Sequence, residues 1–309
     1  MPGPIAEVRV LELAQIMAGP ACGLMLADLG AEVIKIEKTA GGDDTRKFLP
    51  PDINGESAAF MMMNRNKKGL ALNLKEQEGI NIFKKMVEQS DVVIENFRKG
   101  TLEKLGIGYE DLKKINPKII LCEISGYGRT GPYADKGGFD LVAQGMSGLM
   151  SITGESSDKP PMKVGAPLTD ITAGILGATG VLAALINRDK TGKGQRVDTS
   201  LYEAGIVHTY WQSAIAGATG KSPGPLGSAH PLTAPYQAFK TKDNWITIGA
   251  SNQNNWMNLL NAIERVDLQE DDRFKDNNSR MKNLEALAPI LQDELLKKTS
   301  NEWIKIFDD

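Results

Sequence analysis

Short apolar runs alternate with longer amphipathic segments over the first two hundred residues. Five apolar runs predict buried strands, at residues 8–13, 31–37, 70–74, 91–95 and 119–124. The segments between them predict helices, at residues 19–29, 76–89 and 109–115. Strands that alternate with helices favour an α/β fold with an open, parallel, Rossmann-like sheet.

The pattern changes in the middle of the chain. Residues 171–187 carry almost no charge and predict a long buried helix, and residues 196–198 predict a further strand. Residues 201–213 have a helical pattern, whereas residues 214–231 are rich in Gly, Ser and Pro and show no periodicity. The remaining segments predict a hairpin followed by three helices, at residues 236–239, 245–248, 254–262, 284–298 and 301–309.

These patterns predict two domains of different class. Residues 1–200 are expected to form a large Rossmann-like domain, and residues 226–309 a smaller α+β domain. Residues 201–225 are expected to form the linker between them.

Composition narrows the possible functions. The 36 basic and 39 acidic residues give a net charge of −3, which disfavours a nucleic-acid binder. The longest apolar run, residues 174–186, is too short and too rich in Gly and Ala to span a bilayer, and the N-terminus lacks the features of a signal peptide. With two cysteines and two histidines, we expect neither a disulfide framework nor a metal site. These features predict a soluble cytoplasmic protein.

The first strand–helix turn carries no dinucleotide-binding fingerprint. Residues 18–23 read Ala-Gly-Pro-Ala-Cys-Gly instead of G-x-G-x-x-G, so a nicotinamide or flavin enzyme is disfavoured. Several blocks nevertheless resemble, in the same order, the class III CoA-transferase family, which includes formyl-CoA transferases, succinyl-CoA:dicarboxylate CoA-transferases and α-methylacyl-CoA racemases. The matching blocks are residues 10–20, 26–37, 42–46, 64–68, 93–97, 105–109, 125–132, 191–195 and 236–239.

This resemblance implies an enzyme that moves CoA from an acyl-CoA donor, such as succinyl-CoA, to a carboxylic acid acceptor. The reaction runs through a mixed anhydride and an aspartyl-CoA thioester, with CoA as substrate and with no tightly bound cofactor or metal. The resemblance also implies an interlocked homodimer. Family members are longer, and the segment that returns from the small domain to the large one has no counterpart here.

Asp170 has two compatible interpretations. It follows a Pro-rich loop at the start of a predicted helix, where an aspartate is usually an N-cap. By resemblance, it is the catalytic nucleophile. A helix N-terminus stabilises negative charge, so we expect it to keep this carboxylate ionised.

Resemblance also suggests residues that bind the substrates. Gln15 is expected to orient the acyl group. Basic residues follow or flank the early strands, where CoA phosphates would bind, although a single surface lysine is more often only solvated: Lys38, Arg46, Lys67, Lys68, Lys75, Lys99 and Lys104. Family position selects six CoA-binding residues: Lys38, Leu72, Lys75, Asn96, Phe97 and Lys104. Three residues are candidates to bind the acceptor carboxylate: Arg129, Tyr133 and Lys163.

Two alternatives remain open. A racemase of this family pairs the aspartate with a histidine, whose place is taken here by Phe139. Asp140 is either a replacement base or the N-cap of a helix that begins near residue 141. The second alternative is a truncated, non-catalytic fragment that binds acyl-CoA. Residues 224–230 are either a glycine lid over the nucleophile or a plain linker.

Overall fold

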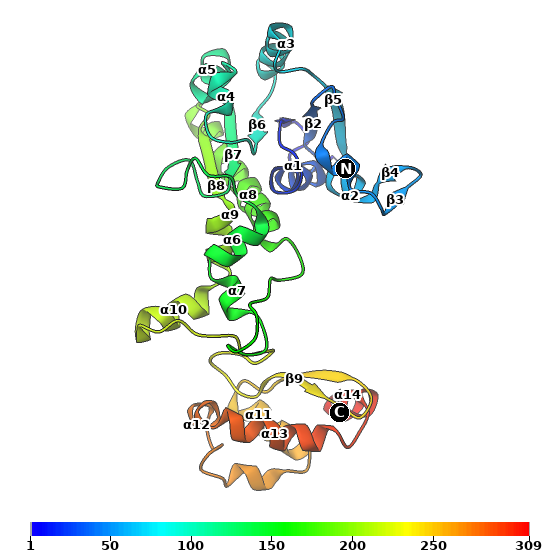
Figure 1. The fold of residues 1–309 in the computed structure, drawn as a ribbon, viewed down its shortest axis with the longest axis vertical. Helices are drawn as coiled ribbons and strands as arrows, with labels where there is room; N and C mark the ends of the chain where they lie inside the picture. The colour runs from blue at the N-terminus through cyan, green and yellow to red at the C-terminus, as the bar shows by residue number, and fades with distance from the viewer. Residues whose placement is uncertain (1, 309) are drawn as a thin grey trace. The chain divides into compact units, whose positions relative to one another are not determined.

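The computed structural model describes residues 2–308, and its contacts separate into two compact units (Figure 1). The first unit runs to Met150 and resumes over Lys163–Tyr210. The second comprises Ser151–Met162 and the chain from Trp211 onward. Each unit has a hydrophobic core of its own.

A six-stranded parallel sheet forms the centre of the first unit. Its strands, in spatial order, are β5 (Lys67–Ala71), β2 (Glu32–Glu37), β1 (Arg9–Glu12), β6 (Val92–Glu95), β7 (Ile120–Ser125) and β8 (Arg196–Ser200). The chain moves outward from β1 to β2 and β5, then returns to β6 on the other side of β1. This reversal is a topological switch point, and open α/β sheets bind ligands at the carboxyl ends of the strands there.

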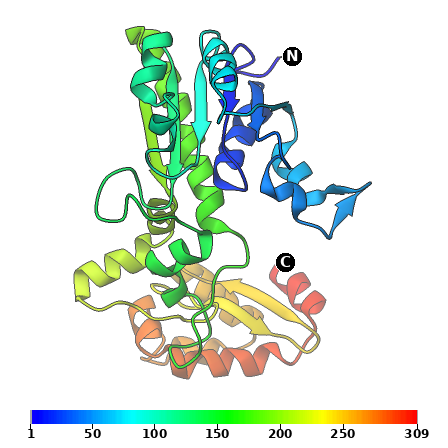
Figure 2. The ribbon, with the colours of Figure 1, turned by 45° about the horizontal axis from the view of Figure 1, so that its top comes forward.

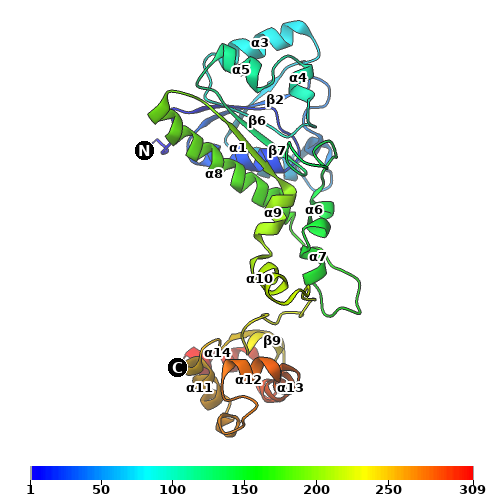
Figure 3. The same cartoon turned by 90° about the vertical axis from the view of Figure 1, so that its left-hand side faces the viewer.

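Helices cover both faces of this sheet (Figure 3). One face carries α1 (Ala18–Asp28) and α8 (Leu168–Thr191), and the other carries α3 (Gln77–Val87), α4 (Thr101–Lys104) and α5 (Tyr109–Ile115). Side chains alternate between the two cores along each strand. In β1, for example, Val10 packs with the α1–α8 side and Leu11 with the other side.

Helices α1 and α8 pack closely through small residues. A Cβ atom added at Gly174 would lie 2.6 Å from the Cβ of Ala21 and 2.8 Å from the carbonyl oxygen of Ala18. Among the described helices, α8 alone has the length and apolar character of a membrane span, and half of that span is buried within the molecule. The helix is longer than the sequence pattern predicts, and it serves as a core helix of this unit.

Shorter elements complete the first unit: η1 (Asp44–Lys47), β3 (Asp52–Ile53), β4 (Glu56–Ser57), α2 (Ala58–Asn64), α6 (Asp140–Met146) and α9 (Leu201–Val207). Two further helices contain the boundaries between the units: α7 (Leu149–Ile152) and α10 (Tyr210–Thr219).

The expected linker over residues 201–225 differs from the structure, because α9 and α10 occupy most of it. The Ser200 hydroxyl caps α9 by accepting from the backbone N–H of Glu203 at 3.1 Å. The alanines within α10 are strong helix formers and outweigh its single internal glycine. The irregular chain starts only after Thr219.

The second unit contains an antiparallel hairpin and a set of helices (Figure 2). The hairpin pairs β9 (Tyr236–Lys240) with β10 (Trp245–Gly249). The helices are α11 (Gln253–Ala262), η2 (Val266–Gln269), α12 (Asn277–Lys282), α13 (Leu284–Leu295) and α14 (Ser300–Asp308). Trp256, Phe274, Leu291 and Trp303 lie at the centre of its core.

Four charged side chains are buried together between the sheet and α1. Glu12 is fully buried and forms ion pairs with Lys35 at 2.9 Å and with Lys67 at 2.8 Å. Lys35 also contacts Asp43 at 2.8 Å. A Cβ atom at Gly23 would lie 1.8 Å from Glu12 Oε2, so the glycine makes room for the carboxylate. Burial opposes charge on Lys35, but Glu12 and Asp43 together raise the pKa of this amine.

Lys67→Met tests the contribution of this network to stability. Removing one partner leaves the Glu12 charge buried with fewer contacts, which is expected to lower the free energy of unfolding by about 3–5 kcal/mol. Lys68→Met is the matched control, because Lys68 pairs with Glu32 while its side chain stays 71% exposed. This control is expected to cost about 0–1 kcal/mol in the same denaturant titration. Equal losses in the two variants would contradict the prediction.

Candidate active site

The loop after β1 is held in a strained conformation at the switch point. Ile16 has a φ of 71°, which is rare for a β-branched residue and costs about 1–3 kcal/mol. Its N–H lies 3.2 Å from both carboxylate oxygens of Asp43. The amide of Asn96 accepts from the N–H of Gln15 at 3.0 Å and donates to its carbonyl at 2.8 Å. These contacts fix the backbone that carries Gln15.

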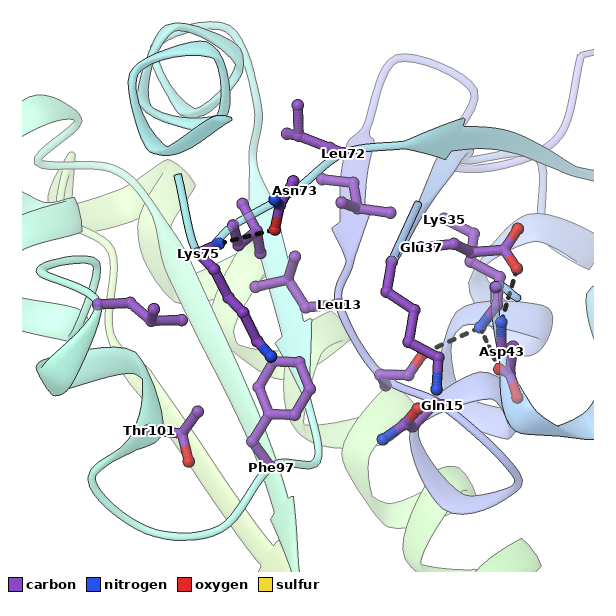
Figure 4. A pocket seen from close by; sticks show the side chains of 16 residues that line it. Leu13, Gln15, Lys35, Glu37, Asp43, Leu72, Asn73, Lys75, Phe97 and Thr101 are labelled. Atoms are coloured by element: carbon purple, nitrogen blue, oxygen red, sulfur yellow. Dashed lines mark hydrogen bonds and ion pairs between the residues drawn. The ribbon is translucent and has the colours of Figure 1, made fainter. Parts of the chain in front are cut away.

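An apolar cavity of about 310 Å³ opens beside this loop (Figure 4). Four of the residues predicted to bind CoA line it: Lys38, Leu72, Lys75 and Phe97. The side chain of Lys75 extends toward the Phe97 ring. Lys104 is exposed on α4 and is not part of the lining. Asn96 is also absent from this lining, and its amide is engaged by the backbone of Gln15.

A second cavity of about 270 Å³ contains Asp170. Gln15, Asn96 and Phe97 also line it, and Gln15 and Phe97 are shared with the apolar cavity. The two cavities therefore adjoin. The structure thus brings the predicted nucleophile and most of the predicted binding residues to the carboxyl ends of β1 and β6.

Asp170 is not the N-cap of its helix. Pro167 occupies that position, and Asp170 is the third residue of α8. Across residues 2–308, the carboxylate of Asp170 makes no hydrogen bond or ion pair. Burial, together with the negative charge of Asp140, raises the pKa of Asp170 to about 7. Burial and Asp140 therefore oppose the ionisation of Asp170 that the helix N-terminus is expected to favour.

Asp140 caps the helix that carries Asp170. It is the first residue of α6, whose N-cap is Phe139, so its prediction as the cap of α6 is wrong. Its carboxylate accepts from the Thr169 N–H at 2.9 Å, the Thr169 hydroxyl at 2.7 Å and the Gln144 amide at 2.8 Å. Asp140 thus accepts hydrogen bonds from Thr169, the residue before Asp170. The Asp170 carboxylate itself stays unpaired among residues 2–308.

A second buried ion network fixes the wall that separates the cavities. Glu95 accepts from the N–H of Phe97 at 2.7 Å, and Arg129 donates to the carbonyl of Phe97 at 3.1 Å. Arg129 is 7% exposed and also pairs with Glu95 and Glu123. The structure therefore places Arg129 in a buried ion network and outside the lining of the Asp170 cavity, so it does not support the predicted role in binding an acceptor carboxylate there.

Other predicted cations are also engaged within the protein. Arg46 forms a bidentate pair with Glu37, at 2.7 and 2.9 Å, and Lys67 belongs to the buried network. Lys67 and Lys68 lie at the amino end of β5, because this strand begins three residues earlier than predicted. Arg98 was missed by the sequence analysis and lines the Asp170 cavity. The signal that could have identified it is its position directly after Asn96 and Phe97.

Histidine is absent from the described lining of this cavity. Phe139 lines it at the place where the racemases carry histidine. His208 instead contacts the Thr172 hydroxyl at 2.7 Å, and His230 lies in the second unit beside Tyr236. The segment 224–230 also lies in the second unit, and its role as a lid stays a prediction. The described lining therefore presents one carboxylate, Asp170, without a histidine beside it to act as the partner base.

Comparisons with known proteins identify similar sequences. The model of CoA-transferase family III matches residues 5–309. The mouse succinyl-CoA:glutarate CoA-transferase is 39% identical over 99% of this chain and 70% of its own length. The acetyl-CoA:oxalate CoA-transferase of Acetobacter aceti is 37% identical over 98% of this chain and 78% of its own length.

A solved structure extends the similarity to the fold. A CAIB/BAIF family protein from Brucella suis superposes with a TM-score of 0.87 and 38% identity. The match covers all of this chain and 82% of that one. Sequence blocks, fold and site thus lead to the same assignment: the chain belongs to CoA-transferase family III.

Proposed function

We propose that this protein transfers CoA from an acyl-CoA to a dicarboxylic acid, with Asp170 as the covalent nucleophile. The observation that carries the proposal is the unpaired Asp170 carboxylate in a cavity that shares Gln15 and Phe97 with an apolar, lysine-bearing cavity. The names of similar proteins support the substrate class, since they include transferases of succinyl-CoA with glutarate and of acetyl-CoA with oxalate.

The apolar cavity suits the CoA part of the substrate. Leu72 and Phe97 offer apolar surface for the pantetheine or adenine groups. Lys38 and Lys75 offer charge for the phosphates, and the Lys38 side chain is 49% exposed while it pairs with Asp44. A thioester that leaves this cavity past Phe97 enters the cavity of Asp170. Gln15 lines both cavities and is placed to orient the acyl carbonyl.

The chemistry proceeds through three covalent states of Asp170, which are two mixed anhydrides and an aspartyl-CoA thioester between them. The carboxylate attacks the thioester carbonyl, and CoA thiolate leaves to give a mixed anhydride. The thiolate then attacks the Asp170 carbonyl, which releases the donor acid and forms an aspartyl-CoA thioester. The acceptor carboxylate displaces the thiolate to form a second anhydride. Attack of the thiolate on the acceptor's carbonyl releases the new acyl-CoA and regenerates Asp170.

The environment of Asp170 suits this role. A carboxylate with few hydrogen bonds loses little solvation when it attacks, and a pKa of about 7 leaves a large ionised fraction at neutral pH. The homodimer implied by the family resemblance stays a prediction.

Trapping with hydroxylamine tests the nucleophile. Incubation with succinyl-CoA and hydroxylamine is expected to convert Asp170 into its hydroxamate, detected by intact mass and peptide mapping. Asp170→Asn removes the nucleophile and should give no adduct. Asp135→Asn is the matched control, because that side chain is 90% exposed, and it should trap like the wild type. A folded wild type that binds CoA but gives no adduct with any acyl-CoA would refute the proposal and favour a protein that only binds acyl-CoA.

Asp140→Asn tests the electrostatics of the site. Only ionised Asp170 attacks, so the trapping rate of the wild type should rise with pH through about pH 7. The variant keeps an oxygen that can accept from Thr169 but loses the charge that raises the pKa of Asp170. Its profile should therefore shift to lower pH, so that trapping at pH 6 becomes faster relative to the plateau. An unchanged midpoint in a variant of normal thermal stability would contradict this account.

Isotope exchange tests the racemase alternative. The described cavity lining lacks a second base of the kind that racemases use, so a 2-methylacyl-CoA incubated with the protein in D₂O should keep its α-hydrogen. The measurement is the mass of the recovered acyl-CoA, compared with an incubation without enzyme. Enzyme-dependent deuterium uptake that is lost in Asp170→Asn would assign the racemase reaction instead.

A further inference from the structure

We propose that Gln144 is a positioning residue for Asp170, because its buried amide joins the segment that enters the helix of Asp170 to Asp140, which caps that helix. The inference rests on the proposed function, in which Asp170 is the nucleophile. Gln144 lies outside the lining of both cavities. Its role is therefore to hold the backbone of the reacting residue, without contact to a substrate.

The side chain of Gln144 is fully buried, and both polar atoms of its amide have partners. The nitrogen donates to Oδ2 of Asp140 at 2.8 Å and, over a longer distance of 3.4 Å, to the carbonyl of Ala166. The oxygen accepts from the N–H of Val164 at 2.9 Å. A reversed amide would turn its oxygen toward the carboxylate of Asp140, so the chemistry of the partners sets this orientation. A buried amide with its partners in place restricts the positions of all of them.

The two backbone partners of Gln144 lie where the chain enters the first unit for the second time. Residues 151–162 belong to the second unit, and the first unit resumes at Lys163. Val164 and Ala166 follow directly, and Asp170 lies in the first turn of α8. Among residues 2–308, the hydrogen bonds that tie residues 164–167 to an element other than α8 all come from Gln144. Gln144 therefore holds the segment between the boundary of the units and the nucleophile.

Helix α6, which carries Gln144, has close contacts of its own at both ends. A Cβ atom at Gly205 of α9 would lie 2.6 Å from the Cβ of Ser147, which follows α6, and 3.3 Å from Cγ2 of Thr169. The glycine thus allows α9 to approach α6 and the start of α8 together. At the other end, Oδ1 of Asp140 accepts from Thr169 while Oδ2 accepts from Gln144. The series of contacts from Gln144 ends one residue before the nucleophile.

The proposed attack is sensitive to such positioning. Reacting atoms need to lie about 3–3.5 Å apart with the correct approach, and a misplacement of about 1 Å can slow a reaction about 100-fold. The Asp170 carboxylate makes no hydrogen bond among residues 2–308, so its place depends on its backbone and on packing. Loss of the Gln144 amide should therefore slow the covalent step and leave the binding of CoA intact.

Gln144→Met tests the proposal, because it removes the amide at nearly equal side-chain length. We would measure the rate of hydroxylamine trapping at saturating succinyl-CoA, and the Kd for CoA by calorimetry. The saturating rate is expected to fall about 10–100-fold, with the Kd for CoA unchanged. Gln144→Asn keeps an amide but shortens the side chain by one methylene group, so it should lose an intermediate part of the rate. This second variant decides the test if Gln144→Met does not fold.

Asn116→Leu is the matched control, because the amide of Asn116 makes the same kinds of contact. It donates to the carbonyls of Val87 at 3.1 Å and Ser90 at 2.8 Å, and it accepts from the N–H of Lys118 at 3.0 Å. Asn116 lies before the amino end of β7, whereas both cavities lie at the carboxyl ends of the strands. Asn116→Leu should lower the melting temperature and leave the saturating trapping rate unchanged.

Hydrogen exchange separates this proposal from the proposed function. The peptide that spans residues 164–169 should exchange about 5–10-fold faster in Gln144→Met, and at the wild-type rate in Asn116→Leu. A wild type that traps nothing would refute the proposed chemistry, whereas unchanged exchange in Gln144→Met would refute the role of Gln144. The role is also overturned if Gln144→Met traps at the wild-type rate, if Asn116→Leu loses as much rate, or if the affinity for CoA falls together with the rate.

Discussion

The arrangement of both cavities depends on charges buried beneath the carboxyl end of β1. Placing Glu12, Lys35 and Asp43 away from water carries a large desolvation cost, which mutual pairing offsets only when the geometry is well satisfied. Because each group needs the others, the loop they hold has few alternative conformations. This explains how Ile16 persists at a positive φ, and why Gln15 has a defined place at the switch point.

A similar constraint acts on the other side of the switch point. Glu95 and Arg129 hold the two ends of the Phe97 peptide unit, so the ring that separates the cavities has a fixed base. Buried ion pairs contribute little net stability in general. Their role here is to hold the backbone of two loops in place. One network positions the loop after β1 and the other positions the loop after β6. Together they set the passage between the apolar cavity and Asp170.

Competing effects determine the ionisation of Asp170, the proposed nucleophile. The N-terminus of α8 favours the ionised form, while burial and the charge of Asp140 oppose it. The opposing effects prevail, because no donor among residues 2–308 reaches the Asp170 carboxylate. The N–H and the hydroxyl of the neighbouring Thr169 donate to Asp140 instead. The outcome is a group that ionises near neutral pH and has little hydrogen bonding to lose in the proposed nucleophilic attack.

The sequence by itself determined the order of strands and helices, the parallel sheet and the family. These features depend on local periodicity and on contiguous motifs, as in the helix over Tyr109–Ile115, which the pattern predicts with the same bounds. It also led to Asp170 and to several residues that line the cavities. The tertiary structure alone decided which charged side chains are paired within the protein and which remain free to bind a substrate. Arg129 and Lys67 pair with acidic groups far away in the sequence, whereas Arg98 is exposed and makes no ion pair among residues 2–308. Pairing of this kind depends on distances across the sheet, and those distances cannot be predicted from the local sequence.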